Sequence, residues 1–158
     1  MVESITKSNL YNSFAVFREV LKSISALTAL SSKWSSNDRY FEDEPNPKNR
    51  NFIGYPYMLI ETNLDDEHLT FTGLKQMNFT TNVTIRTEYF AERETARLNS
   101  YMNAITNHFN TNQTSLLNTY GLDGIRVSQD RDRDEIAENQ LVVGILTFDY
   151  NVKLDVEN

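Results

Sequence analysis

The sequence is poor in the residues on which many active sites depend. Its 158 residues include no cysteine, which excludes disulfides, thiolate zinc sites, iron–sulfur clusters and cysteine nucleophiles. The five glycines never cluster into a phosphate-binding loop, and there is no Gly-x-Ser-x-Gly elbow for serine hydrolysis. These absences remove several classes of enzyme.

Long apolar runs and an excess of positive charge are also missing. No apolar run approaches about 18 residues, so we expect no membrane-spanning helix. The first residues lack the apolar core of a signal peptide. The 15 Lys and Arg against 22 Asp and Glu give a net charge of −7, which argues against binding driven by nucleic-acid phosphates or by anionic membranes. We expect one soluble, intracellular domain over residues 1–158.

Apolar residues recur at helical spacing in two segments, which predict helices over about 9–29 and about 91–110. Their stripes are Leu10, Phe14, Phe17, Leu21 and Ile24 in the first, and Ala91, Thr95, Leu98, Met102, Ile105 and Phe109 in the second. His108 lies in the last turn of the second helix, where a partly cationic ring would suit the negative end of the helix dipole. A short helical turn around 115–120 is expected to end at Gly121, which tolerates the left-handed conformation.

The connection over 31–54 is rich in serine, asparagine and proline and shows no period. It nevertheless holds the aromatic residues Trp34, Tyr40, Phe41 and Phe52. A structureless loop of this length is unusual in a compact domain and is commonly functional or bound to a partner. Its aromatic side chains either pack on their own domain or bury against a neighbouring subunit.

Strands are expected between the two helices. A first strand is predicted over 55–62, followed by an acidic turn at 63–68. Within a second β-rich stretch, residues 79–89 alternate with the period of two that is typical of a half-buried strand.

The chain closes with a predicted long hairpin. One arm begins at Ile125, a polar tip over 128–135 reverses the chain, and the returning arm covers 140–156. Because that arm is longer than a typical strand, it either bends at Gly144 or pairs in part beyond its own domain. The order of elements predicts an α+β fold with a mixed or antiparallel sheet packed by the two helices.

One segment has the residue types of a metal site: Glu61, then Asp65, Asp66, Glu67 and His68. Carboxylates and imidazole are ligands for Mg²⁺, Mn²⁺ or Zn²⁺, so a metal-dependent nuclease or hydrolase built on 61–68 is an alternative function. The spacing, however, matches neither an EF-hand loop nor a His-Glu-x-x-His helix. We therefore expect a solvated turn, no metal, no cofactor and no enzymatic activity.

The most distinctive string alternates in charge: Asp130, Arg131, Asp132, Arg133 and Asp134. If strand geometry persists through it, the aspartates and the arginines lie on opposite sides. The string is then either a solvated turn, whose exposed ion pairs are worth about 0–1 kcal/mol each, or a docking element for complementary charges on an adjacent copy.

In element order and pattern, nearly the whole chain resembles phage tail terminator or neck (head-tail joining) proteins. The similarity begins with a leading amphipathic helix. It continues in Tyr55-Pro56-Tyr57-Met58-Leu59-Ile60-Glu61, in Val83-Thr84-Ile85-Arg86-Thr87-Glu88-Tyr89-Phe90, in Tyr120-Gly121-Leu122-Asp123-Gly124-Ile125-Arg126-Val127 and in Leu146-Thr147-Phe148-Asp149-Tyr150. The long loop over 31–54 departs from the pattern.

The resemblance implies a structural virion protein of a tailed virus, assembled in the host cytoplasm. Members of that family form a ring, usually of six copies, which caps the tail tube and joins it to the head connector around a channel through which DNA passes without specific binding. A head-completion or stopper protein of the connector is the alternative within this class. The predicted subunit interface comprises Trp34, Tyr40, Phe41, Arg50, Asp130, Arg131, Asp132, Arg133 and Asp134.

Overall fold

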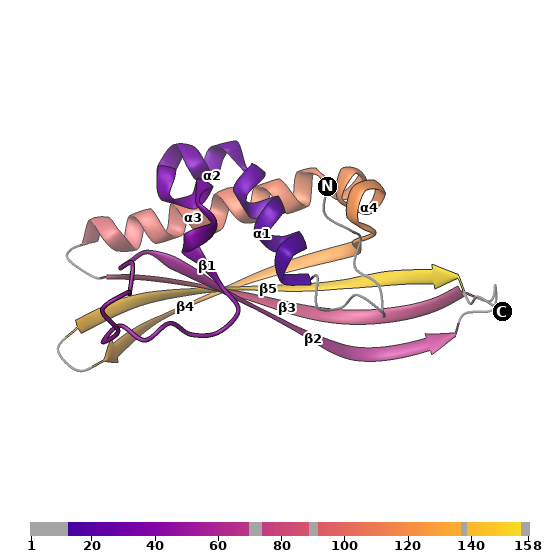
Figure 1. Cartoon of the computed structure of the whole chain (residues 1–158). Coiled ribbons are helices and arrows are strands. Elements are labelled where there is room, and N and C mark those ends of the chain that lie inside the picture. Colours follow the sequence, from indigo (N-terminus) through magenta and orange to yellow (C-terminus); the bar gives the residue numbers. More distant parts are fainter. Residues whose placement is uncertain (1–12, 70–73, 89–91, 137–138, 156–158) are drawn as a thin grey trace.

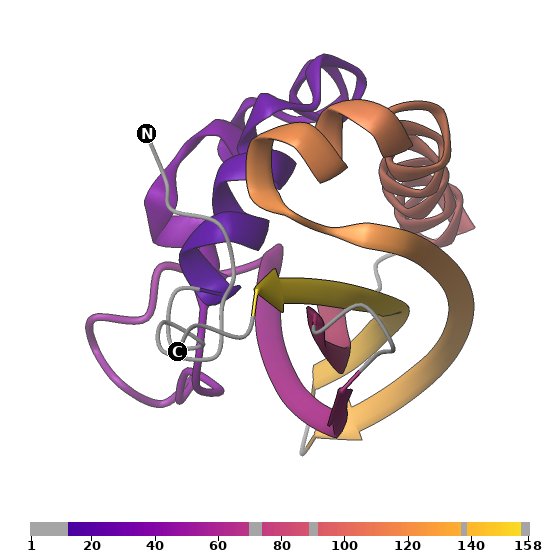
Figure 2. The ribbon, with the colours of Figure 1, turned by 90° about the vertical axis from the view of Figure 1, so that its right-hand side faces the viewer.

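The computed structural model describes residues 13–69, 74–88, 92–136 and 139–155. Its helices lie over one face of a twisted sheet (Figures 1 and 2). In chain order the elements are α1 (Ser13–Ser23), α2 (Ser25–Leu30), the 3₁₀ helices η2 (Ser32–Ser35) and η3 (Asn37–Arg39), β1 (Tyr40–Phe41), β2 (Tyr57–Leu69), β3 (Leu74–Glu88), α3 (Glu92–Thr111), α4 (Gln113–Tyr120), β4 (Asp123–Ile136) and β5 (Asn139–Asp155).

The sheet has five strands in the order β1-β2-β3-β5-β4. β1 runs parallel to β2, and the other neighbouring pairs are antiparallel. This mixed sheet, covered by helices and closed by a C-terminal strand pair, confirms the predicted α+β class. β5 pairs with β3 from Leu141 to Asp155 and with β4 from Asn139 to Asn151, so every residue of this strand pairs within its own domain on at least one side.

The predicted helix over 9–29 is in fact two helices. Its first residues lie outside the described part of the chain, and α1 ends at Ser23, where the hydroxyl donates to the Val20 carbonyl at 2.6 Å. Ile24 then takes an extended backbone, and its N–H bonds to Leu21 in place of Val20. A serine hydroxyl that bonds to a carbonyl of the preceding turn competes with the backbone hydrogen bonds of the helix. The spacing of the apolar residues does not reveal such a break.

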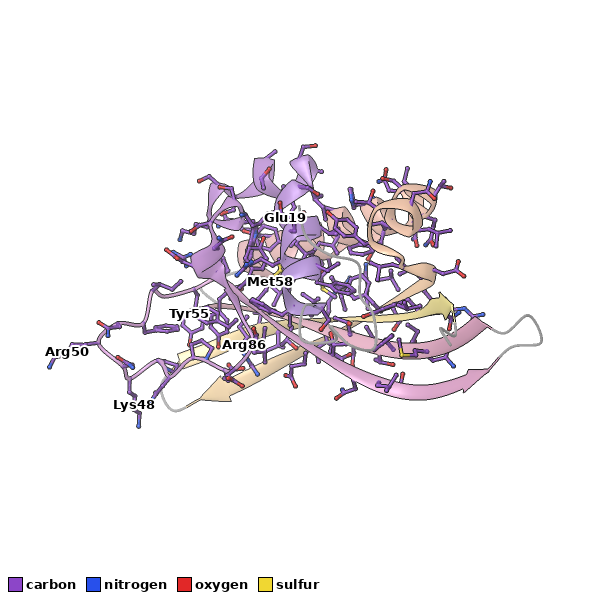
Figure 3. The ribbon with its side chains drawn as sticks, turned by 45° about the vertical axis from the view of Figure 1, so that its right-hand side comes forward. Glu19, Lys48, Arg50, Tyr55, Met58 and Arg86 are labelled. Atoms are coloured by element: carbon purple, nitrogen blue, oxygen red, sulfur yellow. The ribbon has the colours of Figure 1, made fainter. Side chains whose placement is uncertain are left out.

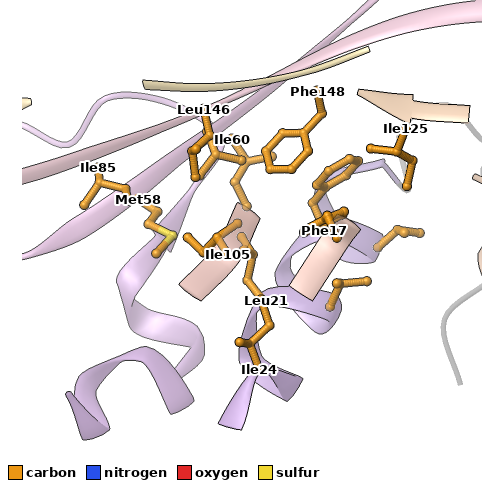
Figure 4. Packing of buried hydrophobic residues seen from close by; sticks show 14 of the residues in the cluster. Phe17, Leu21, Ile24, Met58, Ile60, Ile85, Ile105, Ile125, Leu146 and Phe148 are labelled. Carbon is orange, nitrogen blue, oxygen red and sulfur yellow. The ribbon is translucent and has the colours of Figure 1, made fainter. Parts of the chain in front are cut away.

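Alternating residues of the long strands and the apolar stripes of the helices form the core. Phe17 packs on Phe148 (Figure 4), with ring centroids 5.3 Å apart, and it also stacks on Phe109 at 5.9 Å. The stripe predicted for the second helix is confirmed where it is described: Leu98, Met102, Ile105 and Phe109 are fully buried. Among the helices that the structure describes, none is long and apolar enough to cross a membrane.

The connection over 31–54 is only partly irregular. Two 3₁₀ helices and β1 occupy its first part, so the prediction of a structureless segment is wrong there. Arg39 fastens the far end of the loop by donating to the carbonyls of Gly54 at 3.3 Å and Pro56 at 3.2 Å.

Two predicted turns are strands. Residues 63–68 continue β2 in register with β3, apart from a bulge between Leu64 and Asp66. The polar tip over 128–135 likewise continues β4, which pairs with β5 as far as Ile136. Polar and charged residues suit a strand at the edge of a sheet, where they discourage aggregation, and sequence alone does not distinguish such an edge from a turn.

Gly144 allows a close approach of α3 to β5. The ladder between β3 and β5 runs through Gly144 without a register shift, so the structure shows no irregularity of pairing at the predicted bend. A Cβ atom at this position would lie 2.6 Å from Met102 Sδ and 2.9 Å from Leu98 Cδ1. At the end of α4, by contrast, Gly121 has the predicted left-handed conformation, with φ of 78°.

Candidate functional site

The predicted interface residues Trp34 and Tyr40 belong to the core of their own domain. Trp34 has 0% of its surface exposed and Tyr40 has 4%. The Tyr40 hydroxyl donates to the Trp34 carbonyl at 2.6 Å, and Tyr101 meets the indole edge-on at 5.3 Å. Burial raises the pKa of Tyr40 above its ordinary value. Neither side chain has surface left for a neighbouring subunit, so for these two the interface prediction is wrong.

Phe41 lies in an aromatic cluster that holds the loop against β2. Its ring meets Tyr57 edge-on at 5.5 Å, and Tyr57 also contacts Tyr55 and Phe52. Phe41 and Phe52 remain half-buried. They line an open hollow of about 380 Å³ together with Asp38, Pro45, Asn46, Asn49, Asn51 and Ile53.

Glu44 ties this loop to the sheet. Its carboxylate accepts a hydrogen bond from the Tyr57 hydroxyl and lies 2.7 Å from Arg86 Nε on β3. Burial, followed by the Glu44 contact, raises the pKa of Tyr57. Arg50 and Lys48, both exposed, project from the outer end of the loop (Figure 3). Arg50 is therefore accessible, as an interface residue must be.

Of the alternating string, Asp130 and Arg131 have described side chains, and both are exposed. Asp132, Arg133 and Asp134 lie on β4 in register with Val143, Val142 and Leu141, while their side chains fall outside the described structure. Strand geometry thus persists through the string. In a strand, successive side chains point to opposite faces, as the expected separation of the aspartates from the arginines requires.

The acidic segment does not form the compact turn that a metal cluster would need. Glu61 pairs with Asn82 in the ladder, and Asp65 lies at the bulge. Four strand residues separate them by roughly 13 Å at about 3.3 Å per residue. Among the side chains that the structure describes, no group of three or more Asp, Glu or His could hold a metal. Those of Asp66, Glu67 and His68 lie outside them.

The face of the sheet opposite the helices is polar around Thr80, Thr147 and Asp149, whereas Tyr57, Leu59 and Val143 farther along the same face are buried. Thr80 on β3 donates to Asp149 at 2.8 Å and also contacts Asp65, while Thr147 donates to Asn82 at 2.9 Å. A shallow hollow of about 520 Å³ at this level is lined by both aspartates and by Arg126, among others. The face therefore offers hydrogen-bonding groups around a shallow hollow.

His108 differs from its prediction. Its ring is partly buried at the end of α3 beside Phe109, and its Nδ1 lies 3.3 Å from the Asn112 amide nitrogen. Burial lowers the pKa of His108. The ring is therefore less readily protonated than an exposed histidine, because burial disfavours the charged form.

The feature that sequence reasoning missed is the pair of long strand edges. In the described part of the chain, β4 pairs only with β5, and beyond Leu59 β2 pairs only with β3. Each edge leaves backbone N–H and C=O groups without a strand partner on its outer side. Residues 63–68 and 128–135 are polar, as turns commonly are, so the sequence did not indicate that they extend the two edge strands.

A groove lies beside the β2 edge where β1 stops. It measures about 430 Å³ and is lined by Ser13, Phe14, Glu42, Asp43, Ile60, Glu61, Thr62 and Asn63. We call it the acidic groove, because its charged residues are all carboxylates.

No protein-family model matches the chain, and no curated protein matches it.

Proposed function

We propose that the chain is a structural subunit that assembles head-to-tail into a closed ring at the neck of a tailed virus. The observation that carries this proposal is that one sheet ends in two long, dissimilar edges on opposite sides. An unpaired edge is a template for another strand. When two different surfaces of identical copies meet, the contact is heterologous, and it generates a ring if the rotation closes.

The identity of the ring follows from the resemblance to tail terminators. On that basis, about six copies surround a channel, the tail tube lies on one side and the head connector on the other. The polar part of this sheet face suits the wall of such a channel, since the described carboxylates of Asp65 and Asp149 line its hollow. Acidic walls repel phosphates and let DNA slide.

Negative-stain electron microscopy and native mass spectrometry of the purified chain test the proposal. We expect annuli of uniform diameter and one dominant closed oligomer that persists on moderate dilution. A chain that stays monomeric at high concentration, or that stops at a two-fold dimer, contradicts it. Sedimentation with isolated tail tubes separates the terminator from the stopper alternative, because only a terminator binds the end of the tube.

A further inference from the structure

We infer that the β4 edge of one copy lies along the β2 edge of the next, with Arg131 in the acidic groove of that neighbour. This inference rests on the proposed ring and names the two surfaces that build it. The occupant of the groove is thus a second copy of this chain.

The acceptor is a strand edge with a hollow beside it. β1 pairs with β2 only at Met58 and Leu59. After Phe41 the chain enters the loop, and the acidic groove opens beside Ile60–Asn63. The strand at this point therefore has both an unpaired side, within the described residues, and room next to it.

The charges of the acceptor have no counterpart among the side chains that the structure describes. Glu42, Asp43 and Glu61 line one groove, and none of them makes an ion pair or side-chain hydrogen bond with another described residue. The lining of the groove thus carries three carboxylates and no cationic side chain. The groove is complementary to a strand that carries an arginine.

β4 provides such a strand. Arg131 is exposed, and its guanidinium has no ion pair within the described structure. β2 and β4 run in opposite directions in the sheet order, because each of the three intervening pairs is antiparallel. A second copy placed beside the first in the same orientation therefore presents β4 antiparallel to β2, which continues the pattern of the sheet.

Charge also selects this pairing over the symmetric ones. Two β2 edges brought together would face one acidic groove with another, and two β4 edges would leave both grooves empty. The first of these contacts is a like-charge juxtaposition, which disfavours a wrong partner, and the second leaves the carboxylates of both grooves without a cation. Pairing β2 with β4 brings Arg131 to the carboxylates of the groove and leaves a new β2 and a new β4 edge exposed, as growth toward a ring requires.

Charge reversal in the full chain tests the inference. We expect Arg131→Glu and, separately, Glu61→Lys to weaken assembly about tenfold or more, because each places like charges in contact. In an equimolar mixture of the two variants, the β4 edge of each variant is complementary to the groove of the other, so the mixture should recover annuli in which the two variants alternate. The double variant Arg131→Glu/Glu61→Lys, in which the charges are exchanged, should recover annuli.

Matched controls are Lys48→Glu and Glu19→Lys, which reverse exposed charges on the loop and on α1 (Figure 3), at positions that belong to neither β2, β4 nor the lining of the groove. Both should keep annuli, and thermal unfolding verifies that every variant folds. If the wild type forms annuli and the single reversals keep them, or if the exchanged pair stays dissociated, the inference is overturned and the proposed ring stands. A monomeric wild type overturns both.

Discussion

The contact between Gly144 and α3 predicts the effect of a single added methyl group. In Gly144→Ala the new Cβ would lie 2.6 Å from Met102 Sδ and 2.9 Å from Leu98 Cδ1, where non-bonded heavy atoms prefer about 3.5–4.0 Å. The overlap is therefore roughly 1 Å against Met102. Because both atoms are near the ends of side chains, rotamer changes absorb part of it.

Overpacking of this kind typically costs about 1–3 kcal/mol of unfolding free energy. At about 2–4 °C per kcal/mol for a domain of this size, Gly144→Ala should lower Tm by about 2–12 °C. Thermal unfolding followed by circular dichroism measures the change, and urea denaturation gives the free energy directly.

A double-mutant cycle identifies the cause. Met102→Ala alone should cost about 2–5 kcal/mol by leaving a cavity. In the Met102→Ala background the alanine at 144 gains space, so the two effects should fall short of additivity by about 1 kcal/mol or more. A Gly144→Ala protein as stable as wild type, or strictly additive effects, would refute the close approach of α3 to β5.

Two further predictions concern side chains that differ from their sequence-based interpretation. Trp34→Ala should cost about 3–5 kcal/mol in urea denaturation of the isolated chain, because Trp34 is fully buried; a loss confined to assembly would contradict this. The lowered pKa of His108 means that the unfolded chain binds its proton more readily. The free energy of unfolding should therefore fall as pH decreases through about 6.5. His108→Gln should reduce this pH dependence relative to wild type. If the free energy of unfolding of the variant depends on pH as steeply as that of wild type, the prediction is refuted.

The sequence predicted those elements whose residues repeat with a clear period. The stripe that includes Leu98 and Ile105 located α3, and the alternation over 79–89 located most of β3, because a single buried face imposes each pattern. Gly121 similarly marked the end of α4, since few other residues accept its positive φ.

Features that depend on distant parts of the chain were not predictable in the same way. The break at Ile24 depends on one serine hydroxyl, and the burial of Trp34 depends on Tyr101, far along the chain. The edges of β2 and β4 are polar because solvent, or a partner, lies beside them. The acidic groove brings together segments near 13, 42 and 61, which only the tertiary fold makes neighbours.

The two hairpins of the sheet give the subunit distinct ends. β2 and β3 meet beside Asp155, at Leu69 and Leu74, whereas β4 and β5 meet at Ile136 and Asn139, at the opposite end of the strands (Figure 1). An annulus whose strands run along its axis would consequently have two chemically different rims. Two different rims would let a ring built from a single polypeptide bind one structure above it and a different structure below, without a second protein to distinguish the two sides.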